Sequence, residues 1–211
     1  MAERPVLVLG THNKKKGIEL AELLAPHGLE LRTLDDFPNA VEVEETGATF
    51  AENARLKATV QAQHLDAWVL GEDSGIAVDA LDGRPGVWSA RYAGPHATDR
   101  TNNDRLLEEL HGVPAKRRTA HYVCHAALAD PAGNLQTERE EICRGRILQE
   151  PHGTGGFGYD PLFEIVEYHR SFGQLGSAVK SVLSHRSRAL RALLPEVVRL
   201  LSHPAFEMRS V

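Results

Sequence analysis

The chain has 211 residues, of which 42% are hydrophobic and 25% charged, a composition typical of a soluble globular protein with one domain or two closely joined lobes. Its formal net charge of -5, from 24 lysines and arginines against 29 aspartates and glutamates, gives no support to nucleic-acid binding. No apolar run is long enough to cross a bilayer, and the first residues contain no secretory hydrophobic segment, which excludes a membrane partner at this level.

The chain begins with a short apolar run, residues 6–10, that predicts a buried strand. A polar turn with three lysines follows, and residues 18–24 carry leucines at helical spacing. A strand, a turn and a helix in this order direct backbone N–H groups and a helix N-terminus at one point, which favours an anion. Three lysines at a helix start oppose the helix dipole, so we expect a negative group beside them, although a solvated basic turn would look the same. Residues 29–34 predict a second strand, and residues 41–45 alternate like an exposed strand.

The next helix has a clear start signal. Thr49 and Glu52 have the spacing of a capping box, which predicts a helix to about residue 64. Asn53 and Lys57 are one turn apart on this helix, so they share a face, as an ordinary surface pair also would.

Two acids and a hydroxyl mark the centre of the chain. Residues 68–70 are apolar and predict the end of a buried strand, and Glu72, Asp73 and Ser74 follow between two glycines. Carboxylates placed where a strand ends are typical of the carboxyl edge of an α/β sheet, where ligands tend to bind. A turn with solvated acids is the alternative. Residues 82–86 then predict a tight turn.

Residues 101–111 predict a helix, and residues 118–129 and 135–148 predict two long strands joined as a hairpin. We expect this hairpin to belong to a second lobe. Cys124 and Cys143 fall in these strands without the spacing of a metal site, so we expect reduced core thiols in a cytoplasmic protein.

Residues 153–161 place four glycines around Phe157 and Asp160. Such a loop suits close backbone approach to a flat ligand, with the aromatic ring as a stacking platform. A hairpin tip without a ligand is the alternative interpretation.

The last helix carries a stripe of leucines and valines that predicts core packing. Ser184 is a candidate N-cap, which puts His185 and Arg186 in the first turn, near an end that favours anions. Pro195 is expected to kink this helix or divide it.

Five motifs in series resemble the inosine triphosphate pyrophosphatase family, in the family's order and over nearly the whole chain. They are Thr11-x-Asn13-x-x-Lys16, residues 44–58, Asp73-Ser74-Gly75 with residues 85–92, residues 155–161, and Ser184-His185-Arg186. Two positions depart from the family pattern: Glu72 stands where many bacterial members have Asp, and Ala178-Val179 replaces a common acidic pair. The resemblance implies one α/β domain over residues 1–211, with a mixed central sheet, flanking helices and a hairpin-bearing second lobe. Its active site would lie in the groove between the lobes.

The resemblance also implies the reaction. Members hydrolyse dITP, ITP and XTP to the monophosphate and pyrophosphate, which keeps these deaminated nucleotides out of DNA and RNA. It assigns Asp73 as general base and metal ligand and Glu44 as a second ligand of Mg²⁺, with Glu45 and Glu72 as alternatives. Oxygen ligands of this kind suit Mg²⁺. A homodimer is the family's expected assembly.

The other candidate residues are divided into those expected to contact the phosphates and those expected to contact the base. The expected phosphate contacts are Thr11, His12, Asn13, Lys14, Lys15, Lys16, Lys57, Lys180 and the further donor Ser74. The expected base contacts are Phe157, Gly158, Tyr159, Asp160, His185 and Arg186. Donors from His185 or Arg186 would meet the purine 6-oxo group, and adenine would leave them unpaired at a cost of about 1–3 kcal/mol. Rejection of guanine must involve the 2-position.

Two other functions remain open from the sequence. One is a Maf-like pyrophosphatase for modified pyrimidine nucleotides, which also begins with a strand, a turn and a helix. The residues 157–160 and 184–186 argue against it. The other is a nucleotide-binding module without catalysis, against which the unbroken set of candidate ligands argues.

Overall fold

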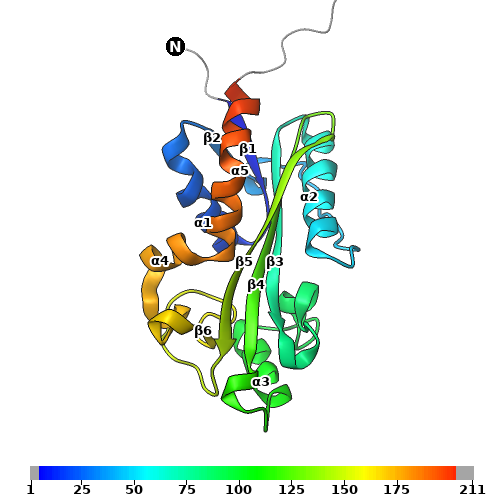
Figure 1. Cartoon of the computed structure of the whole chain (residues 1–211). Coiled ribbons are helices and arrows are strands. Elements are labelled where there is room, and N and C mark those ends of the chain that lie inside the picture. The colour runs from blue at the N-terminus through cyan, green and yellow to red at the C-terminus, as the bar shows by residue number, and fades with distance from the viewer. Residues whose placement is uncertain (1–4, 203–211) are drawn as a thin grey trace, which may run out of the picture.

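The computed structural model describes residues 5–202, which form one seven-stranded mixed sheet flanked by helices (Figure 1). The strands are β1 (Val6–Gly10), β2 (Glu30–Thr33), β3 (Val69–Val78), β4 (Thr119–Ala129), β5 (Leu135–Ile147), β6 (Phe163–Ile165) and β7 (Arg170–Ser171). The long helices are α1 (Lys14–Leu24), α2 (Phe50–Leu65), α3 (Asp99–Glu109), α4 (Phe172–Leu183) and α5 (His185–Ser202). The strand order is β2-β1-β3-β4-β5-β6-β7, with β1 parallel to β2 and β3 and the other pairs antiparallel. The predicted fold class, a mixed central sheet with flanking helices, is confirmed.

The upper lobe in Figure 1 has three layers, with α1 and α5 on one side of the sheet and α2 on the other. Side chains alternate between the two faces along a strand, and Leu70 therefore packs with α1 and α5 while its neighbour Val69 packs with α2. The alanines of α2 allow the helix to lie close to the sheet. Gly71 is required there, because a Cβ atom on it would lie 2.5 Å from the backbone of Ala54 and Ala58.

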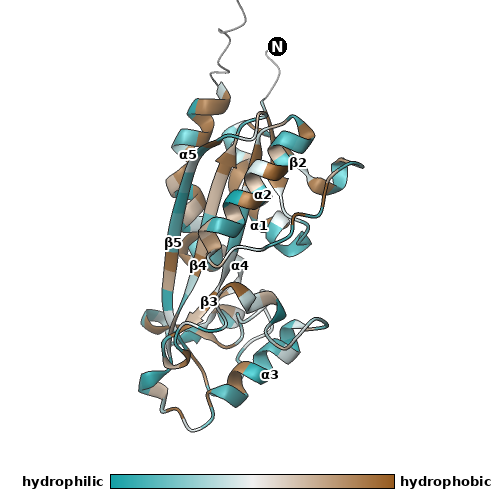
Figure 2. Ribbon diagram, turned by 90° about the vertical axis from the view of Figure 1, so that its right-hand side faces the viewer, coloured by the Kyte–Doolittle hydropathy of each residue, from teal (hydrophilic) through white to brown (hydrophobic). Residues whose placement is uncertain are grey.

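The lower lobe is built on the same strands. β3 and β4 continue past the end of β1, and their far halves pack with α3, β6 and the start of α4 around a separate core (Figures 1 and 2). The predicted β4–β5 hairpin is present, and it is part of the central sheet that runs through both lobes. Its turn packs on α2, since a Cβ atom on Gly133 would lie 3.2 Å from the carbonyl oxygen of Thr59.

Two local predictions are wrong. Residues 41–45 form no strand, because Val41 exchanges backbone contacts with the side chain of Gln61 on α2 instead of with another strand. The strand that was expected to end near residue 70 continues to Val78, because β4 supplies hydrogen-bonding partners where β1 ends. The acids therefore lie within a strand and not in a turn.

The other element predictions are confirmed to within a few residues. Thr49 and Glu52 form the expected capping box of α2, and residues 153–161 form a loop. The expected division at Pro195 is wrong, because α5 continues through this residue as one helix. Cys124 and Cys143 are buried and unbridged. Within residues 5–202 no helix has the length and apolar character needed to cross a membrane.

Candidate active site

Asp73 lies in the middle of β3, between the cores of the two lobes, and is 5% exposed. Its carboxylate accepts hydrogen bonds from Lys57 Nζ at 2.9 Å and Asn53 Nδ2 at 3.2 Å, both from the first turns of α2. Lys57 also pairs with Glu45 at 2.8 Å. Burial raises the pKa of Asp73 although Lys57 and Lys16 oppose the shift, and a raised pKa makes its carboxylate a stronger base.

Glu72 precedes Asp73 in the same strand and therefore points to the opposite face. There it meets Lys16 Nζ from α1 at 2.8 Å and an Arg186 nitrogen from α5 at 3.2 Å, and Ser74 donates to it at 3.1 Å. Burial would raise the pKa of Glu72, but Arg186 and Lys16 hold it well below its ordinary value. Glu72 is thus a buried anion that ties α1 and α5 to the sheet.

Asn13 caps α1, as its Oδ1 accepts from the backbone N–H groups of Lys15 at 3.1 Å and Lys16 at 3.2 Å. These two amides, which were expected to cradle phosphate, are thus engaged by Asn13. Lys15 Nζ pairs with Asp99 of α3 at 2.8 Å. Asp99, which pairs with Lys15, and Glu72, which pairs with Lys16, are the negative groups that were expected beside the lysines. Lys14 is exposed.

A first cavity, of about 240 Å³, opens beside Asp73. We call it the phosphate cavity because it collects most of the predicted phosphate contacts. Its lining includes Thr11, His12, Asn13, Lys16, Lys57, Asp73 and Ser74.

The predicted metal ligands are placed unequally around this cavity. Glu45 lines it and approaches Asp73 through their shared contact with Lys57. Burial would raise the pKa of Glu45, but Lys57 lowers it, so the carboxylate is ionised. Glu44, the first choice from the sequence, is exposed and is not among the lining residues.

A second cavity, of about 100 Å³, adjoins the first and is called the base cavity here. Its lining includes all six predicted base contacts, Phe157, Gly158, Tyr159, Asp160, His185 and Arg186. Asn13, Lys16, Ser74 and Ala90 line both cavities. The chain therefore forms one continuous site with a polar, charged end and an aromatic end.

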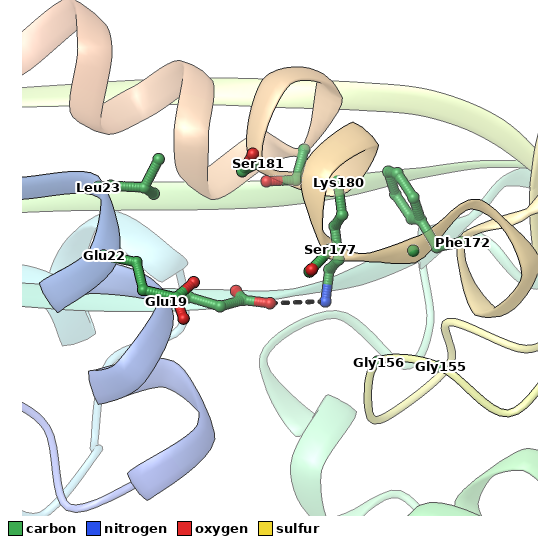
Figure 3. Close-up of a pocket in the computed structure, with 11 residues that line it drawn as sticks. Glu19, Glu22, Leu23, Gly155, Gly156, Phe172, Ser177, Lys180 and Ser181 are labelled. Carbon is green, nitrogen blue, oxygen red and sulfur yellow. Dashed lines mark ion pairs between the residues drawn. The ribbon is translucent and has the colours of Figure 1, made fainter.

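Lys180, predicted as a phosphate contact, lies at the base cavity and does not line the phosphate cavity. Its Nζ donates to Asp160 at 2.6 Å, pairs with Glu19 of α1 at 2.8 Å and lies 4.3 Å from the centroid of the Phe157 ring. Figure 3 shows Lys180 pointing toward Glu19 across a third cavity of about 300 Å³ between α1 and α4.

His185 and Arg186 begin α5 and are buried. Ser184 caps the helix as predicted, because its hydroxyl accepts from the backbone N–H of Ser187 at 3.2 Å. Burial holds the pKa of His185 well below its ordinary value, so the imidazole is neutral. Within residues 5–202, His185 Nδ1 and Arg186 Nε are buried without a hydrogen-bond partner. An unpaired buried donor is unfavourable by about 1–3 kcal/mol, and a ligand acceptor would remove that cost.

Several residues at the site were given no site role by the sequence analysis, among them Asn53, Glu19, Asp99 and Tyr122. Asn53 and Glu19 carry a weak signal, since they lie one helical turn from Lys57 and Lys16 respectively. Asp99 and Tyr122 reach the site only through the tertiary fold, and no local pattern identifies them.

The chain is similar to known proteins over nearly its whole length. A family model described as the Ham1 family matches residues 7–196. A dITP/XTP pyrophosphatase of Rhodopirellula baltica is 55% identical over 195 residues, 92% of this chain and 94% of the relative. Another dITP/XTP pyrophosphatase, from Desulforamulus reducens, is 48% identical over 197 residues, 93% of this chain and 98% of the relative.

Among solved structures, a HAM1 protein from Coxiella burnetii has a TM-score of 0.84 at 34% identity and covers 92% of this chain and 99% of its own. A nucleoside-triphosphatase, dITP/XTP pyrophosphatase, from Mycobacterium abscessus has a TM-score of 0.73 at 40% identity and covers 91% of this chain and 99% of its own.

Proposed function

The chain belongs to the Ham1 family, and we propose that it hydrolyses dITP, ITP and XTP to the monophosphate and pyrophosphate. This activity would remove deaminated purine nucleotides before they enter DNA or RNA. Relatives named dITP/XTP pyrophosphatase, at 48–55% identity over nearly the whole chain, support this function.

The observation that carries the proposal is the junction of two cavities with different chemistry. The phosphate cavity holds Lys16, Lys57 and Asp73, and the base cavity holds the Phe157 ring beside two buried, unpaired nitrogens of His185 and Arg186. A nucleoside triphosphate has the same division, with about four negative charges at one end and a flat base at the other. The shared lining residue Ser74 would lie near the junction of the two parts.

Mg²⁺ is part of this proposal. Asp73 and Glu45 both contact the one ammonium group of Lys57, so two carboxylates already converge on a cation at the wall of the phosphate cavity. Mg²⁺ usually keeps several waters and is held by one or two carboxylates together with substrate phosphates. We assign Asp73 and Glu45 as its ligands, with Glu44 as the less favoured neighbour. Bound Mg²⁺ would offset negative charge on the phosphate oxygens.

Asp73 is proposed as the general base. Each carboxylate oxygen has two lone pairs, so Asp73 can accept a proton while it still accepts from Lys57 and Asn53. The water that loses this proton forms a bond to the α-phosphorus, and the bond from that phosphorus to the pyrophosphate oxygen breaks. Lys16 and Lys57 would stabilise the charge that develops on the phosphate oxygens.

Base selection is proposed for the unpaired donors at the start of α5. Arg186 Nε always carries a hydrogen, so it can only donate, and the 6-oxo group of hypoxanthine or xanthine would satisfy it. The 6-amino group of adenine would not. The sequence suggested that Lys180 contacts the phosphates. Because Lys180 lies next to Asp160 and Phe157, we propose that it contacts the base instead.

The two alternative functions are not favoured. A preference for modified pyrimidines or a loss of catalysis would both depart from relatives that are named dITP/XTP pyrophosphatase at about half sequence identity. We also propose that the protein is a homodimer, that it is cytoplasmic and that it does not bind nucleic acid. Sedimentation would test the dimer as twice the 23.2 kDa mass of the chain.

A substrate panel tests the proposed function. Pyrophosphate release is measured with Mg²⁺ and each of dITP, XTP, dATP, dGTP, dTTP and 5-methyl-UTP. We expect dITP and XTP to be hydrolysed in preference to the other four. Faster turnover of the pyrimidines would support the Maf-like function, and dITP binding without pyrophosphate release would support a binding module.

A further inference from the structure

Tyr122 lies at the base cavity although no sequence motif includes it. It is placed in the middle of β4, opposite Ile76 of β3 and Cys143 of β5, and is 7% exposed. Its position in the central strand of the lower lobe is fixed by the sheet on both sides. A side chain held in this way can position its neighbours.

The first contact of Tyr122 is with Asp160, in the loop of residues 153–161. Its hydroxyl donates to Asp160 Oδ1 at 3.4 Å. Burial raises the pKa of Tyr122 well above its ordinary value, with a further contribution from Asp160, so the phenol keeps the hydrogen that it donates.

Asp160 in turn positions the two groups that would face the purine. Its Oδ2 accepts from the backbone N–H of Phe157 at 2.8 Å and from Lys180 Nζ at 2.6 Å. Gly156 makes room for this carboxylate, since a Cβ atom there would lie 2.0 Å from Asp160 Oδ2. A change in the direction of the Asp160 carboxylate would therefore move both the aromatic platform and the ammonium beside it.

The second contact of Tyr122 is with the start of α5. Its ring stacks on the imidazole of His185, with centroids 4.6 Å apart and an angle of 7° between the planes. Phe163 packs against the Tyr122 ring at 4.6 Å with a tilt of 53°. The plane of the neutral His185 ring, whose Nδ1 has no partner among residues 5–202, is thus set by Tyr122.

We propose that Tyr122 is a positioning residue for nucleobase discrimination, which holds Asp160 through its hydroxyl and His185 through its ring. The inference rests on the proposed function, because it concerns how the same site selects its base. Tyr122 does not line the phosphate cavity, and its hydrogen bond and ring contacts go to Asp160 and His185, so its effect should fall on base recognition and not on the chemical step.

Tyr122→Phe tests the role of the hydroxyl, because the ring and its stacking remain. We expect kcat/KM for dITP to fall by up to about tenfold, mainly through a higher KM, because Asp160 loses one of the groups that hold its carboxylate in place. The value for dATP should fall less, since adenine shares the Phe157 platform but gains nothing from correctly aligned donors, so the ratio of dITP to dATP should fall. Tyr92→Phe is the matched control: Tyr92 is also 7% exposed, lies in the lower core and lines neither cavity, and should keep the wild-type ratio.

An unchanged ratio in Tyr122→Phe would overturn the inference, as would an equal fall for both nucleotides, which a purely structural role predicts. A double-mutant cycle with Asp160→Ala, which removes both side-chain oxygens, gives a second readout: the effect of Tyr122→Phe on dITP affinity should disappear in that background. Full additivity would contradict the assigned route through Asp160. If the wild-type protein itself fails to prefer dITP over dATP, the proposed function fails, and that outcome is seen before any variant is compared.

Discussion

Asp73 is the residue on which the proposed chemistry depends most. Asp73→Asn keeps the size of the side chain but removes the proton acceptor. We expect pyrophosphate release from dITP to fall by about 10²- to 10⁴-fold, the usual contribution of a general base, with the fold retained. Far-UV circular dichroism checks the fold, and Asp104→Asn, at an exposed position of α3, serves as the control that should behave as wild type. A near-normal rate in Asp73→Asn would remove Asp73 from this role.

His185 makes a different prediction, which concerns stability. Burial lowers its pKa well below the ordinary value of 6.5, so below pH 6.5 the unfolded chain binds a proton that the folded protein does not. The free energy of unfolding should therefore decrease as the pH falls below 6.5, by up to about 1.4 kcal/mol per pH unit from this group. His185→Gln should reduce that slope, as measured by urea unfolding at several pH values. Equal slopes in the two proteins would contradict a buried neutral His185.

At the residue scale, most of the residues predicted from the sequence line the two cavities, but their arrangement there could not be predicted. Asp73, Lys16 and Lys57 could be predicted because each stands in a motif that resembles one of the family's motifs. They could not distinguish Glu44 from Glu45, since the strand expected over residues 41–45 does not form and only the path of the loop decides which carboxylate faces the cavity.

At the element scale the close packing of α2 on β3 positions Lys57 and Asn53 against Asp73. Gly71→Ala would place a Cβ atom 2.5 Å from the backbone of α2 and push the helix away from the sheet. We expect a loss of about 1–3 kcal/mol in the free energy of unfolding, together with lower activity.

Gly17→Ala is the matched control for this prediction. Gly17 lies inside α1, and a Cβ atom there would find its nearest neighbour at 3.9 Å. Alanine is the better helix former by up to about 1 kcal/mol, so this variant should be as stable as wild type or more stable. Equal destabilisation of both variants would show that close approach at Gly71 is not the cause.

Helices were predicted well because their caps are local signals, as with Thr49 and Glu52. Strand ends were predicted less well because a strand ends where its partner ends, and partners are distant in sequence. β3 continues past residue 70 for this reason, since β4 pairs with it up to Val78. The same pairing puts Glu72 and Asp73 on opposite faces, which a turn would not.

At the scale of the whole molecule, β3, β4 and β5 run through both lobes, so we expect the chain to unfold as one domain. The two tryptophans report on different lobes: Trp68 packs with the upper core, and Trp88 lies in the 3-10 helix Gly86–Arg91, whose backbone bonds to Asn102 of α3. Trp68→Phe and Trp88→Phe each leave one probe. Their fluorescence transitions in urea should coincide, and separate midpoints would indicate two independently unfolding units.

The central claim is that a single nucleotide occupies both cavities, with its phosphates beside Asp73 and its base beside Phe157. The most direct measurement is a crystal structure of the Asp73→Asn variant with ITP and Mg²⁺. We predict electron density for the triphosphate between Lys16 and Lys57, and for a purine at the Phe157 ring with its 6-oxo group near Arg186 or His185. Density for the base outside the cavity lined by Phe157, or for phosphates away from residue 73, would contradict it.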